Sequence, residues 1–232
     1  PGVTAPGTGS RPRIAVLPVP TADQRVAIFA GGCFWSMQKA FDGVPGVLTT
    51  SAGYAGGSTA NPTYEEVCSG RTGHAESVQV IYDPATISYQ RLLDIYWHHI
   101  DPLTVNRAFC DRGPQYRSII FYRDAEQHRL AEQSRRALDD SHRFKAKVVT
   151  AIEPATKFYP AEEYHQQFYK KNPERYEAYR IGCGRDARLA QLWGDSHESR
   201  VSSRGSQAAQ VGSIGVNNEN PRLVTHDSRL AT

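Results

Sequence analysis

The amino-acid sequence predicts an α+β fold, with helices packed on a mixed, mainly antiparallel sheet around a ferredoxin-like β-α-β core. Apolar strand patterns and amphipathic helix patterns follow one another in the order β-α-β-β-α-β-α-β-α, which is typical of this class. All 12 Tyr, 8 Phe and 3 Trp residues of the 232-residue chain lie between positions 25 and 194. This gathering of large apolar side chains predicts a single folded domain over residues 25–194.

Three strands and two helices are predicted in the first part of this domain. Residues 25–30 (RVAIFA) form a continuous apolar run typical of a buried strand, and a Gly-Gly turn leads into a helix over residues 34–41. Residues 47–54 and 76–82 are the next two strands. Ser88 begins the second helix as its N-cap, because the apolar residues that follow share one helical face: Leu92, Leu93, Tyr96, Trp97 and Ile100.

Two strands and two helices complete the predicted domain. Residues 117–122 (RSIIFY) form a strand, and Asp124 with Gln127 makes a capping box for a helix that reaches about residue 141. Residues 147–152 are the last predicted strand. Pro160 is suited to the first turn of a helix, so a final helix is expected from there to about residue 169.

The two ends of the chain differ in composition from the domain. Residues 1–24 contain five Pro, three Gly and no aromatic residue, which predicts a disordered or extended N-terminal arm. Residues 195–232 lack aromatic residues and Cys, which predicts a disordered C-terminal tail. The chain begins at Pro1, which fits either a removed signal peptide or another trimmed start. The compartment is therefore unknown: cytoplasmic by default, exported or periplasmic if a signal peptide was removed.

Composition excludes several classes of function. Lys and Arg exceed Asp and Glu by only 27 − 24 = 3, so neither a nucleic acid nor a membrane is expected as a partner. No apolar run approaches the ~18–20 residues of a membrane span. The four Cys include no C-x-x-C pair, so no metal site is expected, and no cofactor is predicted. Nothing indicates an oligomer, and a soluble monomer is expected.

The stretch Gly31-Gly32-Cys33-Phe34-Trp35 is the most informative for chemistry. A strand, a Gly-Gly turn and a helix in succession place the Cys33 sulfur at a helix N-terminus, which is expected to lower the pKa of the thiol and favour thiolate. Phe34 and Trp35 place two large apolar faces beside the sulfur, which suits a small apolar group as substrate. A buried core Cys beside two core aromatic residues fits the same spacing.

Two further stretches hold candidate acids and hydrogen-bond donors. Glu76 opens a predicted strand after a Gly-rich polar loop that begins near Tyr64. Burial there would raise the pKa of Glu76 and suit it to act as a general acid, whereas a solvated carboxylate fits the sequence as well. In the second stretch, Asp111 lies in a turn and Tyr116 follows it. The Tyr116 hydroxyl is placed either in a pocket or at the edge of the sheet.

The last candidate stretch surrounds Cys183. Gly182 and Gly184 on either side predict a loop with a mobile backbone, and Arg180 and Arg185 are expected to support a Cys183 thiolate. A Cys on a flexible basic loop suits a partner that moves to meet another sulfur. A plain loop Cys fits the same pattern.

The residues alone leave rival functions open. Cys33 with His74 as base and a carboxylate would make a Cys-dependent thiol hydrolase or acyltransferase. A redox-regulated binding module without enzymatic activity is a third class. A metal site built from His98 or His99 with His74 and His165 is not favoured, because adjacent residues on a helix point in different directions.

Four motifs in order resemble one family: GGCFW at residues 31–35, SAGYAGG at 51–57, YEEVCSGRTGHAE at 64–76 and QYRS at 115–118. Over about residues 26–194 the chain resembles the peptide-methionine (S)-S-oxide reductases, the A-type methionine sulfoxide reductases. The resemblance implies an oxidoreductase of protein repair and the oxidative stress response. Such an enzyme reduces the S-epimer of methionine sulfoxide, either free or in oxidised proteins.

The resemblance also implies a role for each candidate residue. Cys33 would attack the sulfoxide sulfur, and Glu76 would protonate the sulfoxide oxygen. Tyr64 and Tyr116 would hydrogen-bond this oxygen, with Asp111 in the same pocket. The methyl group of the substrate would lie against two aromatic residues, Phe34 and Trp35.

Recycling of the nucleophile is implied in the same way. Cys33 would become a sulfenic acid, a second Cys would condense with it to a disulfide, and thioredoxin would reduce this disulfide. Ser36 stands where the family often has Gly or Cys, which removes one candidate for the second Cys. The resolving Cys lies in a variable part of the family. Cys183 is the expected resolving cysteine because Gly residues flank it, with Cys110 and Cys68 as alternatives.

Overall fold

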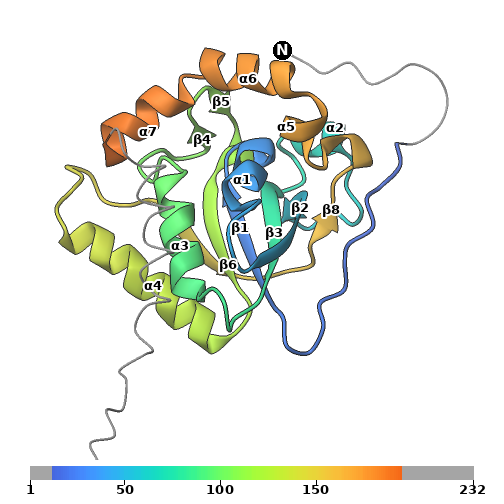
Figure 1. Ribbon diagram of the computed structural model, residues 1–232. Helices are drawn as coiled ribbons and strands as arrows, with labels where there is room; N and C mark the ends of the chain where they lie inside the picture. Colours follow the sequence, from blue (N-terminus) through green and yellow to red (C-terminus); the bar gives the residue numbers. More distant parts are fainter. Residues whose placement is uncertain (1–11, 195–232) are drawn as a thin grey trace, which may run out of the picture.

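A six-stranded sheet forms the centre of the protein in a computed structural model that describes residues 12–194. The strand order is β7-β6-β1-β3-β2-β8, with β6 and β7 parallel and the other neighbours antiparallel (Figure 1). The strands are β1 (Arg25–Gly31), β2 (Val47–Ala55), β3 (Ala75–Tyr82), β6 (Ser118–Tyr122), β7 (Ala151–Pro154) and β8 (Tyr159–Pro160). The mixed, mainly antiparallel sheet predicted from the sequence is therefore confirmed.

The four strands β6, β1, β3 and β2 form the ferredoxin-like core. Within this core, each strand is antiparallel to the strands beside it. Helix α1 (Phe34–Phe41) connects β1 to β2, and α3 (Tyr89–His98) lies between β3 and β6 in the chain, which gives the β-α-β-β-α-β order of this core. Because β1 lies between β3 and β6, the turn that follows β1 is held beside the ends of both neighbours.

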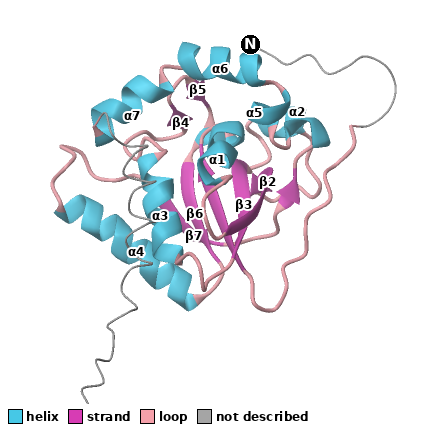
Figure 2. Ribbon diagram, in the orientation of Figure 1, coloured by secondary structure: helices cyan, strands magenta, loops and turns pink. Residues whose placement is uncertain are grey.

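Two apolar cores lie on opposite faces of the sheet. Successive side chains of β1 alternate between them, with Phe29 in the larger core and Ile28 in the smaller one. The larger core is covered by α1, α3 and α4 (Ala125–Asp140), and Figure 2 shows α1 and α3 against the sheet. The smaller core is closed by Phe158 and by Leu17 from the N-terminal segment.

The N-terminal segment that the structure describes runs along the sheet edge beyond β8. The backbone N–H of Ala15 donates to the carbonyl of Ala161, and Ile14 forms an isolated bridge with Glu162. Residues 1–11 of the predicted arm and the predicted tail, residues 195–232, lie outside the described residues. Within residues 12–194, no helix combines the length and the apolar character needed to cross a membrane.

Several predicted elements are wrong in position or type. The helix expected from Pro160 is absent, because Pro160 ends the edge strand β8 opposite Gly53. An edge position suits Pro, which has no N–H to give to a ladder. The strand expected over residues 147–152 lies at Ala151–Pro154 instead. The polar loop after Tyr64 begins with a short helix, α2 (Tyr64–Cys68). A capping box between Thr63 and Glu66 caps the N-terminus of this helix.

The segment after residue 167 contains three helices that the sequence analysis missed or misplaced. They are α5 (Phe168–Lys171), α6 (Pro173–Gly182) and α7 (Arg185–Trp193). In Figure 1, α6 and α7 extend along one side of the molecule above a two-stranded ribbon formed by β4 (Arg107–Ala108) and β5 (Asp111–Arg112). The prediction of a mobile loop around Cys183 is therefore wrong, because Cys183 is the C-cap residue of α6 and Gly184 is the N-cap residue of α7.

Candidate active site

The turn between β1 and α1 fixes the position of Cys33. Gly32 adopts a positive φ of 83°, which favours glycine, and an added Cβ there would lie 2.4 Å from the Cβ of Ala108. Cys33 is the N-cap residue of α1, as the sequence predicts. It is a free thiol with 6% of its surface exposed. The tight turn therefore holds the Cys33 sulfur at the start of a helix and at the wall of a cavity.

A cavity of about 590 Å³ opens at this turn. All seven residues proposed from the sequence for the nucleophile, acid, hydrogen-bond donors and methyl pocket line it: Cys33, Phe34, Trp35, Tyr64, Glu76, Asp111 and Tyr116. Four further lining residues come from α5 and α6: Phe168, Arg175, Ala178 and Tyr179. The sequence analysis missed these four because it did not predict α6. The Asn172-Pro173 pair was an available signal, since Pro is favoured at the first helical position.

Glu76 enters the cavity from β3, with 2% of its surface exposed. Its Oε2 accepts a hydrogen bond of 3.0 Å from the backbone N–H of Phe34, at the first turn of α1. Burial raises the pKa of Glu76 to about 8 against the opposing effect of this hydrogen bond, and Asp111 raises it further. At neutral pH the carboxyl group is therefore mostly protonated and has a proton to donate.

The Cys33 thiol does not have the lowered pKa expected from its place at a helix N-terminus. Burial raises its pKa above the ordinary value, and the carboxyl groups of Glu76 and Asp111 add to the effect. A hydrogen bond with Tyr179 and the charge of Arg185 act in the opposite direction but are outweighed. The prediction of a lowered pKa is thus wrong for the protein without substrate, because it considered the helix alone and not the buried carboxyl groups.

Aromatic side chains form one wall of the cavity. The ring of Trp35 stacks on that of Phe168 with 3.8 Å between centroids, and its indole N–H donates to Nδ1 of His165 at 3.1 Å. The ring of Phe34 lies 4.9 Å from that of His165. Burial lowers the pKa of His165 to about 3, so the ring is neutral and its Nδ1 is free to accept. His165 therefore fixes the orientation of the apolar wall.

Three phenol groups also line the cavity, from Tyr64, Tyr116 and Tyr179. Tyr64 is anchored by its backbone N–H, which donates to Oε1 of the buried Glu162 at 2.9 Å. Tyr116 ends a 3-10 turn, Pro114–Tyr116, just before β6. The hydroxyl of Tyr179 donates to Oδ2 of Asp111. Burial raises the pKa of each of these three phenols, so all three hydroxyls keep their protons as hydrogen-bond donors.

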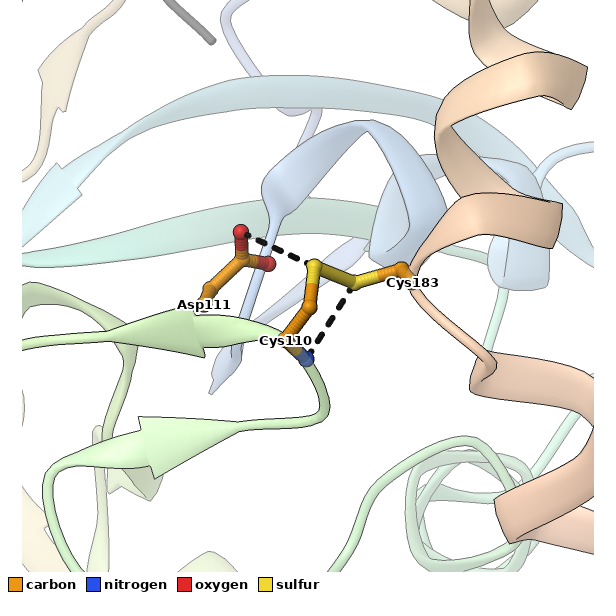
Figure 3. A group of neighbouring side chains, drawn as sticks. All are labelled: Cys110, Asp111 and Cys183. Atoms are coloured by element: carbon orange, nitrogen blue, oxygen red, sulfur yellow. Dashed lines mark hydrogen bonds between the residues drawn. A yellow bond between two sulfur atoms is a disulfide. The ribbon is translucent and has the colours of Figure 1, made fainter.

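Cys110 and Cys183 form a disulfide beside the cavity (Figure 3). Cys110 is exposed, and the next residue, Asp111, lines the cavity. Oδ1 of Asp111 lies 3.7 Å from the Cys110 sulfur, and the Cys110 backbone N–H donates to the Cys183 sulfur at 3.2 Å. The two sulfurs and the Asp111 carboxylate lie within 4.8 Å of one another, as metal ligands would, but here both sulfurs are bonded to each other.

The sequence analysis expects Arg180 and Arg185 to support a Cys183 thiolate, but both side chains have other partners. Arg180 forms an ion pair with Asp186 and donates to the hydroxyl of Tyr176. Arg185 turns inward, where it donates to the carbonyl of His99 at 2.7 Å. Both residues are buried in the helix packing, and the Arg180–Asp186 ion pair joins the end of α6 to the start of α7.

His74 is not placed to act as a base for Cys33. Its Nδ1 accepts a hydrogen bond from the backbone N–H of Gly57 at 3.0 Å, and its Nε2 lies 2.8 Å from the carbonyl oxygen of Thr59. Both ring nitrogens therefore serve the loop before β3, and His74 does not line the cavity. This geometry removes the base that a thiol hydrolase or acyltransferase would need.

A buried free thiol, a protonated carboxyl group and an adjacent disulfide around one cavity define a cysteine-dependent oxidoreductase. Over residues 25–197 the sequence matches the family described as peptide methionine sulfoxide reductase. The chain belongs to this family.

Relatives in sequence and in structure agree with the assignment. The peptide methionine sulfoxide reductase MsrA of Bacillus licheniformis is 52% identical over 177 residues, which cover 76% of this chain and 98% of the relative. Methionine sulfoxide reductase A of Corynebacterium diphtheriae is similar in structure, with a TM-score of 0.60, 34% identity, and coverage of 71% of this chain and 86% of that one. Mxr1 from Saccharomyces cerevisiae in reduced form has a TM-score of 0.62 and 32% identity, with coverage of 66% and 88%.

Proposed function

We propose that the protein reduces the S-epimer of methionine sulfoxide, free or within oxidised proteins, to methionine. The observation that carries the proposal is the convergence of Cys33, the protonated Glu76 and the wall of Phe34 and Trp35 on one cavity. The aromatic wall suits the methyl group, and the acid suits the oxygen that must leave. The choice of the S-epimer follows from the family. We also propose that the protein acts as a monomer.

The test is the consumption of racemic methionine sulfoxide with dithiothreitol as reductant, followed by chiral chromatography. The S-epimer should disappear while the R-epimer remains. Consumption of neither epimer, or of both at equal rates, would contradict the proposal.

The reaction begins with attack of the Cys33 sulfur on the sulfoxide sulfur. The thiol loses its proton in this step, and Glu76 supplies a proton to the sulfoxide oxygen, since unprotonated oxide is a very poor leaving group. Tyr64 and Tyr116 hold the same oxygen by hydrogen bonds, and Asp111 orients Tyr179 beside the sulfur. The protonated oxygen then moves from the substrate sulfur to the Cys33 sulfur: the S–O bond of the substrate and the bond between the two sulfurs break, and a new S–O bond forms on Cys33. Methionine leaves, and Cys33 becomes a sulfenic acid.

Recycling proceeds through the cysteines beside the cavity. The Cys183 thiol condenses with the sulfenic acid of Cys33 to form a disulfide and water. The Cys110 thiol then attacks Cys183, which releases Cys33 as a thiol and leaves the Cys110–Cys183 disulfide that the structure contains. Thioredoxin reduces this disulfide by exchange. Cys33 is buried whereas Cys110 is exposed, so the transfer brings the disulfide to where a partner protein can reach it.

Replacement of Cys183 should separate sulfoxide reduction in the first turnover from the recycling of Cys33 by thioredoxin. In Cys183→Ser the first turnover needs only Cys33 and Glu76, so a burst of about one methionine per enzyme should survive. Steady-state turnover with thioredoxin should collapse, because thioredoxin attacks a disulfide more efficiently than a sulfenic acid. Quenched-flow methionine release and thioredoxin-coupled turnover measure the two quantities. Turnover with a small dithiol should fall less.

Cys110→Ser is the matched variant for this experiment. It should accumulate the Cys33–Cys183 disulfide after one turnover without reductant, which peptide mass mapping detects. If Cys183→Ser keeps full thioredoxin-linked turnover while Cys110→Ser loses it, Cys110 is the resolving cysteine and the order given above is wrong. A disulfide from Cys33 to Cys68 would instead assign the resolving role to Cys68.

The reductase activity is proposed to reside in residues 25–194. Deletion of residues 195–232 is expected to leave the steady-state rate and the melting temperature unchanged, because every residue of the proposed mechanism lies before position 195. Activity assays and thermal unfolding of the shortened chain measure this. A large loss of rate, or a fall of several degrees in melting temperature, would place the domain boundary further along the chain.

A further inference from the structure

Arg185, the first residue of α7, has a buried guanidinium directly behind the glycine turn that follows β1. The residue is 1% exposed. Its Nη2 donates to the carbonyl oxygens of His99 at 2.7 Å and Gly31 at 3.4 Å, and its guanidinium carbon lies 4.2 Å from the centroid of the Phe109 ring. Its Nη1 is buried and has no hydrogen-bond partner among residues 12–194. A Cβ added at Gly32 would lie 3.8 Å from this Nη1.

The charge of Arg185 is not balanced by an ion pair. A guanidinium keeps its proton in proteins, yet its oxygen acceptors are neutral carbonyls. It forms no ion pair with a carboxylate of residues 12–194. Arg180 on the neighbouring helix differs, since it is also buried but pairs with Asp186. A buried charge without an ionic partner is unfavourable, so the surroundings of Arg185 favour a nearby negative charge.

The Cys33 sulfur is a site for that charge. The groups that act electrostatically on Cys33 come from the elements packed against its turn: Glu76 of β3, Asp111 of β5, Tyr116 of the 3-10 turn, Tyr179 of α6 and Arg185 of α7. Among these five, Arg185 is the cation, whereas the others are acids or phenols. Burial lowers the pKa of Arg185 itself, whereas Tyr179, Cys33 and Tyr176 act in the opposite direction and favour its charged form.

We propose that Arg185 is a positioning residue of the active site, whose buried cation balances the negative charge on the Cys33 sulfur when the thiol gives up its proton. The proposal rests on the proposed function, in which Cys33 is the nucleophile. Arg185 also follows Cys183 by two residues. Its hydrogen bonds to Gly31 and His99 therefore anchor the joint between α6 and α7 beside the turn that holds Cys33.

The test compares the reactivity of Cys33 in full-length variants. Arg185→Gln removes the charge and keeps a polar side chain, Arg185→Lys keeps the charge, and Arg180→Gln is the matched control, a buried arginine whose charge is already paired. Each protein is reduced with a phosphine and alkylated with iodoacetamide at a fixed pH of about 8, and the rate of alkylation of the Cys33 peptide is measured by mass spectrometry. Arg185→Gln should slow this alkylation roughly tenfold, which corresponds to a rise of about one unit in the pKa of the Cys33 thiol.

The two other variants should keep the alkylation rate of Cys33 within about twofold of the parental rate. An unchanged rate in Arg185→Gln, or an equal loss in Arg180→Gln, would overturn the proposal, because the effect would then be absent or merely structural. Should Arg185→Gln lack the native circular dichroism spectrum, Arg185→Lys decides: a folded protein with the parental alkylation rate supports the proposal, and a folded protein with an about tenfold slower alkylation of Cys33 refutes it. Alkylation involves no sulfoxide, so this outcome is distinct from failure of the proposed function.

Discussion

Cys33→Ser is expected to abolish sulfoxide reduction, with less than about a tenth of the parental activity left, because a hydroxyl is a far poorer nucleophile than a thiol near neutral pH. The substitution is nearly isosteric, and Cys33 lies at the wall of the cavity with 6% of its surface exposed. The fold should therefore persist. The measurement is methionine release in a single turnover with enzyme in excess, which does not depend on recycling.

Cys68→Ser is the matched control for this substitution. Cys68 is the second free thiol among residues 12–194, but it is exposed on α2. Its replacement should leave the single-turnover release of methionine unchanged. A burst that survives in Cys33→Ser and disappears in Cys68→Ser would transfer the role of nucleophile to Cys68.

Glu76→Gln is expected to slow formation of the sulfenic acid by roughly 10²–10⁴-fold, the usual size of a general-acid contribution. The amide oxygen can still accept from the Phe34 backbone N–H, as Oε2 of Glu76 does, but the amide has no readily transferred proton. The measurement is again methionine release in a single turnover. A loss of less than threefold would mean that Tyr64, Tyr116 or water supplies the proton.

The pH dependence of the same step gives a second check on Glu76. Burial raises the pKa of Glu76 to about 8, so the proton is present below that pH and is lost as the pH rises through it. The contribution of the acid to the first-turnover rate should therefore fall above about pH 8. In Glu76→Gln this falling limb should be missing, whereas the rise with pH that accompanies ionisation of Cys33 should remain. A falling limb that persists in the variant would assign it to another group.

The strands and the first helices could be predicted because their signals are local. Residues 25–30 are a continuous apolar run, and Gly31-Gly32 before Cys33 marks the turn that the structure contains. The seven cavity residues were found through motifs, and they meet because the antiparallel register sets Glu76 opposite Tyr54 while β1 pairs with β3. The proximity of these residues therefore depends on strand pairing and cannot be predicted from any single stretch of sequence.

Helix α6 and the start of α7 could not be recognised from apolar periodicity, although α7 also has an apolar face formed by Leu189, Leu192 and Trp193. Helix α6 buries Tyr176 and Arg180, and α7 begins with the buried Arg185. A search for apolar faces treats arginine as exposed, so these inward faces escape it. The raised pKa of Cys33 escaped prediction because burial, its main cause, depends on the packing of the whole domain. The carboxyl groups that add to it, Glu76 and Asp111, lie 43 and 78 positions further along the chain.

The Cys110–Cys183 bond joins residues 73 positions apart. A cross-link of this span restricts the unfolded chain, and in the chain-entropy account it adds on the order of 4 kcal/mol to the free energy of unfolding. Reduction by a partner protein, which restores readiness for the next substrate, also removes this restriction. The protein thus alternates between an oxidised form, which has the disulfide and is more stable to unfolding, and a reduced form, which is ready for substrate and less stable. When oxidants are abundant and reductant is scarce, the protein accumulates in the disulfide-bonded form, which is harder to unfold.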